Sequence, residues 1–267
     1  WISISQKVNG VRCIYYKGKF YSRAGKEFVG LDHIKNDIIS VVGDKYILDG
    51  ELVRKNIDNI SDSENFQIGN GLANSKANDK QPLKFVIFDF ISNSDFDSEK
   101  LGYCYSKRRN TLNVLRNEIE KKSLKNIEVV QMLYEGNDHS EIDRCLDFAE
   151  KNDWEGVMIN LDAPYEYKRT KNLIKVKKFL DCDIKCIEVV EGKGKYSGTL
   201  GAITCLYKGN FVNVGSGFTD EQRKYYFQNR NEIIGKIITV KYKEETKNKN
   251  GGISIQFPVF QAVRFDK

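Results

Sequence analysis

The chain has 267 residues, 40% of them apolar and 30% charged, and a formal net charge of +6. At about 100 to 200 residues per domain this length favours two domains, and the ordinary apolar content excludes a collagen-like or largely disordered chain. The apolar runs are far shorter than the roughly 18 residues of a membrane-spanning helix, and no signal segment opens the chain. We therefore expect a cytoplasmic protein with no membrane partner.

Strands are predicted near the beginning of the chain. Val11 to Tyr16 and Lys19 to Ser22 are rich in β-branched and aromatic residues, and the Lys17-Gly18 pair between them has the composition of a tight turn, so a hairpin is expected. Lys45 to Val53 and Phe85 to Phe90 are two further apolar runs that predict strands.

Two amphipathic helices are predicted in the middle of the chain. They follow a polar stretch, Asn56 to Lys80, that is expected to be irregular, with room for one short helix. The second helix comes after Ser140, a residue type that caps helices. Both show apolar residues at helical spacing, namely Leu112, Leu115 and Ile119 in the first and Ile142, Cys145, Leu146 and Ala149 in the second.

The character of the sequence changes near residue 180. Gly156 to Asn160 and Leu173 to Lys177 are predicted strands before this point, and closely spaced strands with glycine-rich turns follow it. Five short strands and one helix suggest a small Greek-key barrel of the OB type. The fold class expected is α+β, with one domain at residues 1–180 and an OB-fold β-barrel at residues 181–267. The barrel elements expected are the strands Ile184 to Val190, Ala202 to Tyr207, Phe211 to Val214, Ile237 to Tyr242 and Val259 to Arg264, and the helix Thr219 to Asn229.

The cysteines and the charge distribution give two further expectations. The six cysteines form no C-x-x-C pair, so neither a zinc knuckle nor a disulfide framework is indicated, and we expect reduced core thiols in a reducing compartment. Residues 181–267 hold 14 basic and 10 acidic residues, so +4 of the net charge of +6 lies there. A basic face on the barrel predicts a polyanionic partner.

An ordered set of short charged motifs runs along the chain. Neither G-x-x-x-x-G-K-[ST] nor G-x-G-x-x-G is present, which argues against a P-loop or a Rossmann site. Alone, each motif is more often a turn, a core residue or a solvated strand, so their joint order carries the argument. The set is Lys7-Val-Asn-Gly-Val-Arg12, Ser22-Arg23-Ala-Gly25, Asp49-Gly50-Glu51, Phe88-Asp89, Glu155-Gly156-Val-Met158, Lys175-Val-Lys177 and Arg264-Phe-Asp-Lys267.

The residue types of this set suit a phosphate site. Lys7 and Arg12 flank a glycine that permits a tight turn, and Lys175 and Lys177 lie two apart on a predicted strand and share a face. Cations that converge in this way neutralise phosphate. A lysine among other cations also loses its proton more readily, and the neutral amine is a nucleophile.

Two carboxylates and one ring complete a candidate nucleotide site. The oxygens of Glu51 suit a ribose hydroxyl and those of Glu155 suit Mg²⁺. Phe88, in a predicted strand, offers a ring face to a purine.

The ordered set resembles the covalent nucleotidyltransferase superfamily, and specifically the ATP-dependent DNA ligases. Their motifs run K-x-D-G-x-R, S-R-x-G, D-G-E, a strand F-D, E-G-hydrophobic, K-x-K and R-x-D-K. The resemblance covers nearly the whole chain and is strengthened by Pro164-Tyr165 and the residues that lead into Lys175. Asn9 stands where the family usually has aspartate, and Asn160 replaces a frequent lysine.

The resemblance implies a minimal two-domain ligase of viral or accessory bacterial type, a monomer of DNA replication and repair. Residues 1–180 would be the adenylation (nucleotidyltransferase) domain. Lys7 would attack ATP to give lysyl-AMP, and the enzyme would seal 5′-phosphate/3′-hydroxyl nicks in double-stranded DNA through a DNA-adenylate, with ATP and Mg²⁺ as cofactors.

The resemblance also implies a role for each motif residue. Those implied for ATP and AMP binding are Ser5, Gln6, Arg12, Arg23, Glu51, Phe88, Met158, Lys175, Lys177, Arg264, Asp266 and Lys267. Those implied for the metal are Glu155 and Glu51, and those implied for DNA are Arg23, Arg169 and the basic face of residues 181–267. The motif at residues 264–267 would reach ATP only if the barrel swings over the first domain, which predicts a closed and an open state.

Three alternatives stay open. A GTP-dependent RNA-capping guanylyltransferase shares the lysine motif, K-x-K and R-x-D-K, although Gly215-Ser-Gly-Phe-Thr-Asp-Glu221 is more similar to ligases. RNA ligases usually lack the terminal R-x-D-K. The chain could also be a non-catalytic basic nucleic-acid-binding module, to which only Asn9 and Asn160 point.

Overall fold

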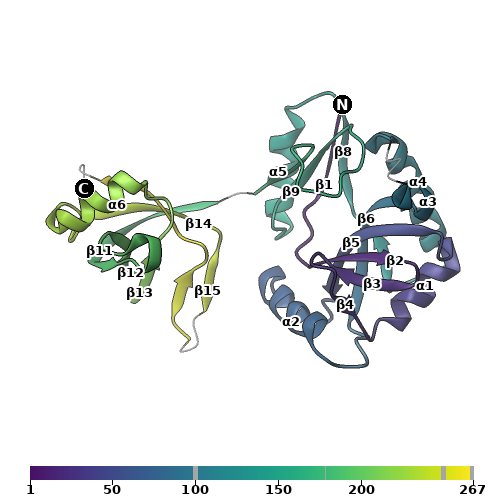
Figure 1. Cartoon of the computed structure of the whole chain (residues 1–267), viewed down its shortest axis with the longest axis horizontal. Coiled ribbons are helices and arrows are strands. Elements are labelled where there is room, and N and C mark those ends of the chain that lie inside the picture. Colours follow the sequence, from purple (N-terminus) through teal and green to yellow (C-terminus); the bar gives the residue numbers. More distant parts are fainter. Residues whose placement is uncertain (99–101, 178, 248–250, 265–267) are drawn as a thin grey trace. The chain divides into compact units, whose positions relative to one another are not determined.

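The computed structural model describes residues 1–98, 102–177, 179–247 and 251–264. The chain divides into two compact units, Trp1–Lys177 and Lys178–Lys267, which Figure 1 shows with their elements labelled. Sheets and helices occur in the first unit and a strand-rich barrel forms the second, so the expected α+β class is confirmed. None of the described helices is long and apolar enough to cross a membrane.

A six-stranded sheet forms the centre of the first unit. Its strands are β2 (Val11–Tyr16), β3 (Lys19–Ser22), β4 (Glu27–Phe28), β5 (Tyr46–Arg54), β6 (Leu83–Ser92) and β7 (Ile127–Val129). Their order is β4-β3-β2-β5-β6-β7, and only β6 and β7 run parallel. Lys17 and Gly18 both have positive φ between β2 and β3, as a type I′ turn requires, and the expected hairpin is confirmed.

Helices pack against this sheet and close its core. They are α1 (Asp32–Val42), α2 (Asp62–Asn74), the short α3 (Asn93–Asp97) and α4 (Tyr105–Lys121). The predicted stripe of α4 is buried, since Leu112, Leu115 and Ile119 are at most 5% exposed. Ile34 and Ile38 of α1 lie four residues apart in the same core, a helical signal that our sequence reading missed.

The polar stretch before β6 holds one helix, as the sequence analysis allowed, but this helix is longer than expected. Helix α2 has 13 residues and begins at Ser61, whose hydroxyl accepts a hydrogen bond from the Glu64 backbone at 3.3 Å. Its buried residues are Asn65, Gly69 and Ala73, at i, i+4 and i+8. A search for apolar periodicity does not find this helix, because its buried face is made of small and polar residues.

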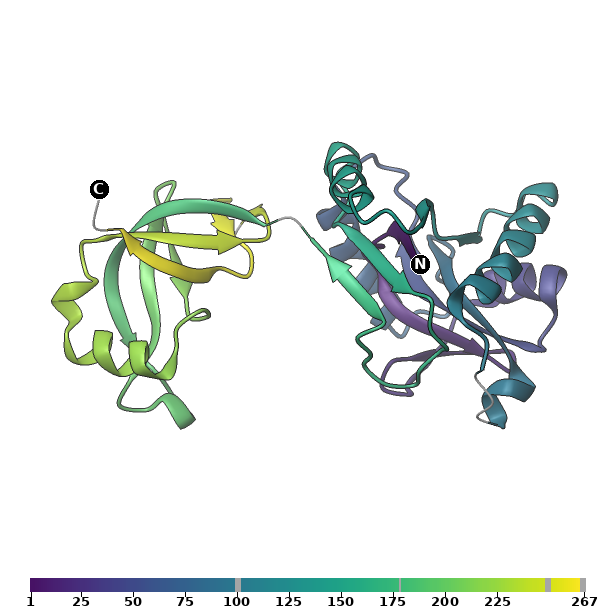
Figure 2. The same cartoon turned by 90° about the horizontal axis from the view of Figure 1, so that it is seen from above.

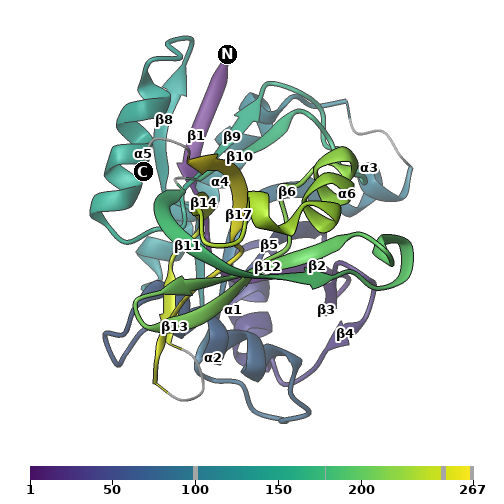
Figure 3. The same cartoon turned by 90° about the vertical axis from the view of Figure 1, so that its left-hand side faces the viewer.

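A four-stranded antiparallel sheet forms the other part of the first unit. Its strands are β1 (Ile2–Gln6), β8 (Met132–Gly136), β9 (Val157–Leu161) and β10 (Leu173–Val176), in the order β10-β9-β1-β8. Helix α5 (Glu141–Lys151) lies against β8 (Figure 3). Ser140 precedes α5 as predicted, but its hydroxyl does not cap the helix and donates instead to Asp138 at 2.7 Å.

The second unit is a five-stranded antiparallel barrel with an additional hairpin. The barrel strands are β11 (Leu180–Glu191), β12 (Leu200–Tyr207), β13 (Asn210–Val214), β14 (Ile237–Tyr242) and β17 (Val259–Arg264), and the hairpin strands are β15 (Glu245–Lys247) and β16 (Ile253–Ile255). The order is β13-β12-β11-β14-β17, and a bridge between Ser216 and Val259 joins the two ends of the sheet. Helix α6 (Asp220–Gln228) lies at one end of the curved strands (Figure 2), flanked by the 3-10 turns Gly194–Tyr196 and Arg230–Glu232.

Five of the six thiols lie in or against the three cores. All six cysteines are free; Cys13, Cys145, Cys186 and Cys205 are buried, and Cys104 and Cys182 are partly exposed. The four buried thiols lie in the cores as expected, whereas Cys104 lies in none of them and its sulfur contacts the Ser106 hydroxyl at 3.2 Å.

Candidate functional site

Two lysine ammonium groups share one carboxylate in the first unit. Lys7 donates a hydrogen bond to Oε2 of Glu155, and Lys177 donates one to Oε1 of the same residue. The side chain of Glu155 is 7% exposed, and those of Lys7 and Lys177 are 16% and 21% exposed. Burial opposes ionisation of Glu155, yet the hydrogen bonds from Lys177 and Lys7 hold its pKa below its ordinary value.

Strand order explains why these three residues meet. Lys7 directly follows β1, Glu155 lies just before β9, Lys177 directly follows β10, and β9 is hydrogen-bonded to both β1 and β10. The backbone N–H of Lys7 also donates to the carbonyl of Gly156 at 3.0 Å. Gly156 has φ +148, and a Cβ there would lie 2.2 Å from the Val176 carbonyl oxygen, so the E-G motif needs its glycine.

Glu51 is the second carboxylate of this site. It lies on β5 opposite Arg12 of β2 in the sheet register. Burial raises its pKa to about 7; Lys7, the Gly10 N–H and Arg12 act in the opposite direction, and Glu155 adds to the increase. These effects place Glu51 within electrostatic reach of both Lys7 and Glu155.

Arg12 is held by a buried carboxylate. Its Nε donates to Oδ1 of Asp49 at 2.5 Å and its Nη2 donates to Oδ2, while the Tyr165 hydroxyl donates to the same Oδ2 at 2.8 Å. Asp49 has no exposed side-chain surface. The guanidinium of Arg12 lies over the ring of Phe88, with Cζ 4.7 Å from the ring centroid. This geometry connects the first motif with D-G-E and with the strand F-D.

The position of Phe88 follows from a bulge in β6. Asp49 pairs with Asp89 and Gly50 pairs with Ile87, so Phe88 is the extra residue between them. A Cβ on Gly50 would lie 2.2 Å from the Val86 carbonyl oxygen, which explains why glycine stands in D-G-E. Phe88 is half-buried.

The aspartate beside Phe88 has a structural role, because it pairs with an arginine of α4. Asp89 binds Arg108 of α4 through two hydrogen bonds of 2.7 and 3.0 Å, and its Oδ1 also accepts from the Phe90 backbone at 2.8 Å. The F-D motif therefore contributes a ring to the site and an ion pair to the packing of α4 on the sheet.

Three predicted nucleotide residues lie at one register position of neighbouring strands. Ser5 of β1 pairs with Met158 of β9, which pairs with Lys175 of β10. Ser5 is buried, Met158 is half-buried and Lys175 is exposed. Gln6, the next residue of β1, donates its backbone N–H to the Gln131 carbonyl at 2.9 Å and is half-buried. Lys175 is therefore a neighbour of the cluster, whereas Lys177 is a member of it.

The remaining predicted residues that the structure describes lie in three further segments of the chain. Arg23 is exposed in the turn after β3, and Arg169 is exposed in the segment between β9 and β10. Arg264 lies in the second unit at the end of β17, where its Nη1 is 3.6 Å from Oδ2 of Asp183. Asp266 and Lys267 fall outside the residues that the structure describes.

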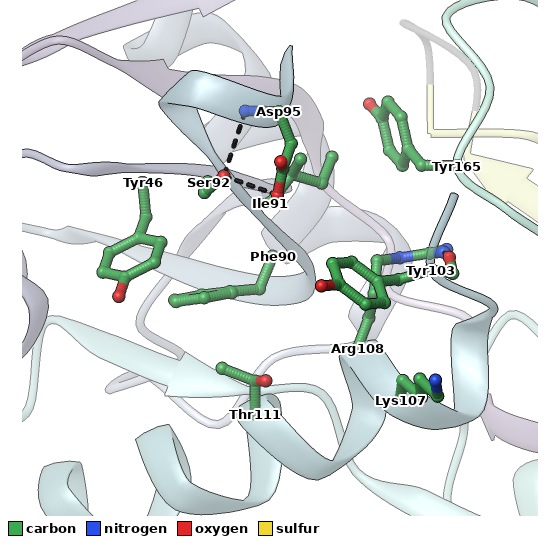
Figure 4. A pocket seen from close by; sticks show the side chains of 10 residues that line it. All are labelled: Tyr46, Phe90, Ile91, Ser92, Asp95, Tyr103, Lys107, Arg108, Thr111 and Tyr165. Carbon is green, nitrogen blue, oxygen red and sulfur yellow. Dashed lines mark hydrogen bonds between the residues drawn. The ribbon is translucent and has the colours of Figure 1, made fainter. Parts of the chain in front are cut away.

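A separate cavity of about 360 Å³ lies beside the Arg12 network. Tyr46, Phe90 and Tyr103 supply aromatic lining, and Arg108 and Tyr165 also border the cavity (Figure 4). Tyr46 and Phe90 are in contact, with ring centroids 4.3 Å apart. Neither Lys7 nor Glu155 lines this cavity, so the candidate site is defined by the ion-pair cluster.

Sequence reasoning missed two contacts of the site. It used Pro164-Tyr165 only as support for the resemblance, and no spacing rule connects Tyr165 with Asp49, 116 residues away. It also assigned no partner to Asn9, whose amide donates to Asp62 of α2 at 2.9 Å. The polar start of α2 was the available signal, and it was assigned to a mainly irregular stretch.

Comparison with known proteins decides the family. The family model of the ATP dependent DNA ligase domain matches residues 2–177, more than half of the chain. The chain belongs to the ATP-dependent DNA ligase family. The model of the DNA ligase OB-like domain matches residues 191–264, so the expected OB-type barrel is confirmed as well.

Several DNA ligases are similar to this member of the family. The DNA ligase of African swine fever virus (isolate Tick/South Africa/Pretoriuskop Pr4/1996) is 31% identical over 268 residues, which cover 90% of this chain and 59% of that protein. The DNA ligase of Haemophilus influenzae is 27% identical over 252 residues, covering 93% of this chain and 82% of that protein. The solved structure of Pmar-Lig_PreS3 has a TM-score of 0.80 and 27% identity, covering 98% of this chain and 63% of that one. The chain thus spans less than two thirds of the viral ligase.

Proposed function

We propose that this chain is an ATP-dependent DNA ligase that seals 5′-phosphate/3′-hydroxyl nicks in double-stranded DNA. The observation that carries the proposal is the cluster in which Lys7 and Lys177 share Glu155, with Glu51 close by. Lys7, Lys177 and Glu155 lie at the junction of β1, β9 and β10, and Glu51 of β5 is within electrostatic reach of Lys7 and Glu155. Family membership adds DNA as the class of substrate.

Lys7 is the proposed nucleophile. After losing one proton, its Nζ attacks the α-phosphorus of ATP, a P–N bond forms, and the bond to pyrophosphate breaks. The ammonium of Lys177 remains beside the α-phosphate and stabilises the negative charge that develops on its oxygens. Lys175, at the adjacent register position, adds a second cation. The AMP is then transferred to the 5′-phosphate of the nick, and the 3′-hydroxyl displaces it.

Glu155 and Glu51 fit a magnesium ion. The described residues contain no cluster of three or more acidic, histidine or cysteine side chains that would bind a metal by themselves. Mg²⁺ is usually held by one or two carboxylates together with substrate phosphates, and this pair supplies that number. When bound, Mg²⁺ would withdraw charge from the phosphates and orient them. Glu155 would then release one or both lysines toward the nucleotide.

The rest of the nucleotide pocket follows from the elements around the cluster. Phe88 would stack on adenine, Arg12 would contact the nucleotide beside it, and Glu51 would accept a hydrogen bond from the ribose. The β-strand residues next to Lys7 would border the base, and these are Ser5, Gln6 and Met158. Arg23, exposed after β3, would guide AMP or the 5′-phosphate.

The second unit is the proposed DNA-binding and activating part. Its excess of basic residues would contact backbone phosphates, with Arg169 of the first unit, which makes binding weakly dependent on sequence. Arg264, Asp266 and Lys267 would reach ATP only in a closed state of the chain, in which they orient the leaving pyrophosphate. We propose that the chain acts as a monomer, with one nucleophile per duplex.

Nick sealing with labelled nucleotide tests the function. The chain is incubated with Mg²⁺ and α-labelled ATP, α-labelled GTP or labelled NAD, and then with nicked duplex DNA. We expect protein-bound label from ATP alone and a sealed strand, both lost in Lys7→Ala and retained in Lys121→Ala, a control at the end of α4 with a 77% exposed side chain. Label from GTP would indicate a capping enzyme, and DNA binding without label would indicate a non-catalytic module; either result overturns the proposal.

A further inference from the structure

Tyr165 holds the carboxylate that holds Arg12. It lies in the segment between β9 and β10, and its hydroxyl donates to Oδ2 of Asp49 at 2.8 Å. Asp49 lies on β5 of the other sheet of the first unit. The bond therefore joins the sheet that carries Lys7, Glu155 and Lys177 to the sheet that carries Arg12.

The carboxylate of Asp49 depends on these two partners. It is fully buried, so an oxygen without a hydrogen bond would stay unsolvated. Oδ1 accepts from Nε of Arg12 at 2.5 Å, and Oδ2 accepts both from Nη2 of Arg12 and from the Tyr165 hydroxyl. The phenol is the third donor to this carboxylate and comes from a different segment than Arg12, so it restricts the orientation in which the carboxylate meets the guanidinium.

Arg12 needs such support. Its side chain is 36% exposed and lies over the half-buried ring of Phe88 with Cζ 4.7 Å from the centroid. A long, partly exposed arginine has many rotamers, and ordering it costs conformational entropy. The buried carboxylate supplies that order, because it binds the guanidinium at two atoms.

We propose that Tyr165 is a positioning residue for nucleotide transfer, which orients Asp49 and through it the guanidinium of Arg12 beside Phe88. The inference rests on the proposed ligase function. Tyr165 is not a catalytic residue, since its hydroxyl is committed to Asp49. Its effect reaches the nucleotide only through Arg12, so removal of the hydroxyl matters as long as Arg12 is present.

Tyr165→Phe is the informative change, and the chain offers a matched control. Phenylalanine keeps the ring that borders the cavity of Figure 4, so only the hydroxyl is lost. Tyr167 lies two residues further on, and its hydroxyl donates to the Phe96 carbonyl at 2.7 Å. Tyr167→Phe therefore removes a hydroxyl from the same segment without touching Asp49.

The experiment is a double-mutant cycle on the rate of protein adenylation in the full chain. Lys7 adenylation is timed against ATP concentration in the wild type, Tyr165→Phe, Tyr167→Phe, Arg12→Ala and the double variant Arg12→Ala/Tyr165→Phe. We expect Tyr165→Phe to lower kcat/KM for ATP about tenfold, mainly through KM, and Tyr167→Phe to stay within about twofold. In the Arg12→Ala background the further loss from Tyr165→Phe should be under about twofold. If Arg12→Ala leaves too little label to time, Arg12→Lys replaces it, because lysine makes no two-pronged contact.

Three outcomes separate the possible failures. A wild type that never acquires label contradicts the proposed function itself. A labelled wild type with Tyr165→Phe at the wild-type rate overturns the positioning role, and so does an equal tenfold loss in both backgrounds. Melting temperatures of all variants are measured alongside, because a purely structural hydroxyl would lower the melting temperature without dependence on Arg12.

Discussion

The side chain of Asn9 donates a hydrogen bond to Asp62, with Nδ2 and Oδ2 2.9 Å apart. Asp62 is the first residue of α2, and its backbone N–H points to Oδ2 of Asp153 at 3.4 Å, two residues before Glu155. The start of α2 therefore contacts both the segment after Lys7 and the turn before Glu155. The amide of Asn9 thus supplies a hydrogen-bond donor to the carboxylate of Asp62.

Replacement of Asn9 by the aspartate usual in the family should therefore harm this chain. An ionised aspartate cannot donate to Asp62, so Asn9→Asp should slow Lys7 adenylation about threefold to tenfold. Adding Asp62→Asn to that variant restores a donor and should recover most of the rate. Initial rates of label transfer from ATP give the answer, and a faster Asn9→Asp variant would show that the contact does not position the loop.

The buried carboxylate of Glu51 should make stability depend on pH. Burial raises its pKa from 4.5 to about 7 in the folded chain. Between about pH 4.5 and pH 7 the folded chain therefore keeps the Glu51 proton, whereas the unfolded chain has lost it. Relative to Glu51→Gln, the wild type should lose stability as pH rises from about 4.5 to about 7, with little further loss above. Urea unfolding of both proteins across this range, in the presence of a chelator, measures the difference. If the difference in unfolding free energy between the two proteins stays constant with pH, the carboxylate of Glu51 is solvated and its pKa is not raised.

The ring of Phe88 should matter for nucleotide binding. Stacking of a base on an aromatic ring contributes about 1–3 kcal/mol, and the same ring lies under Arg12. Phe88→Ala should therefore raise the KM for ATP in adenylation by about tenfold or more, while Phe88→Tyr keeps the ring and should stay within about threefold. Equal KM values for ATP in the two variants would show that the base does not stack on this ring.

Elements with strong apolar periodicity could be predicted from the sequence. Elements that bury small or polar residues, or that depend on strand register, could be predicted only in part or not at all. The hairpin of β2 and β3, strands β14 and β17 and the stripe of α4 agree with the prediction, because alternation and helical spacing are local. The length of helix α2 was underestimated because its buried face consists of Asn65, Gly69 and Ala73. The bulge at Phe88 depends on register between β5 and β6, which no local pattern contains.

The same limit applies to the site. The motifs named Lys7, Glu155 and Lys177, and the structure brings them together because their strands are neighbours. Lys175 was expected to share their role equally, yet it is exposed while Lys177 binds Glu155. The contact of Tyr165 with Asp49 joins two sheets across 116 residues, and such long-range pairs follow from the fold alone.

Arg264 should separate the two halves of the reaction. It lies at the end of β17 near Asp183, in the second unit, and is proposed to act only while Lys7 is being charged. Arg264→Ala should lower adenylation more than about tenfold and leave sealing of a pre-adenylated nick within about twofold. Both steps are measured in single-turnover assays. Equal losses in the two steps would assign Arg264 to DNA binding.

The covalent state of Lys7 gives the most direct test of the account. The chain is mixed with ATP and Mg²⁺, digested under conditions that keep P–N bonds, and its peptides are analysed by mass spectrometry. We predict an AMP adduct on Lys7 that disappears after nicked DNA is added, as AMP passes to the 5′-phosphate. An adduct on another lysine, or a chain that stays unmodified while nicked DNA is sealed, would contradict the central claim.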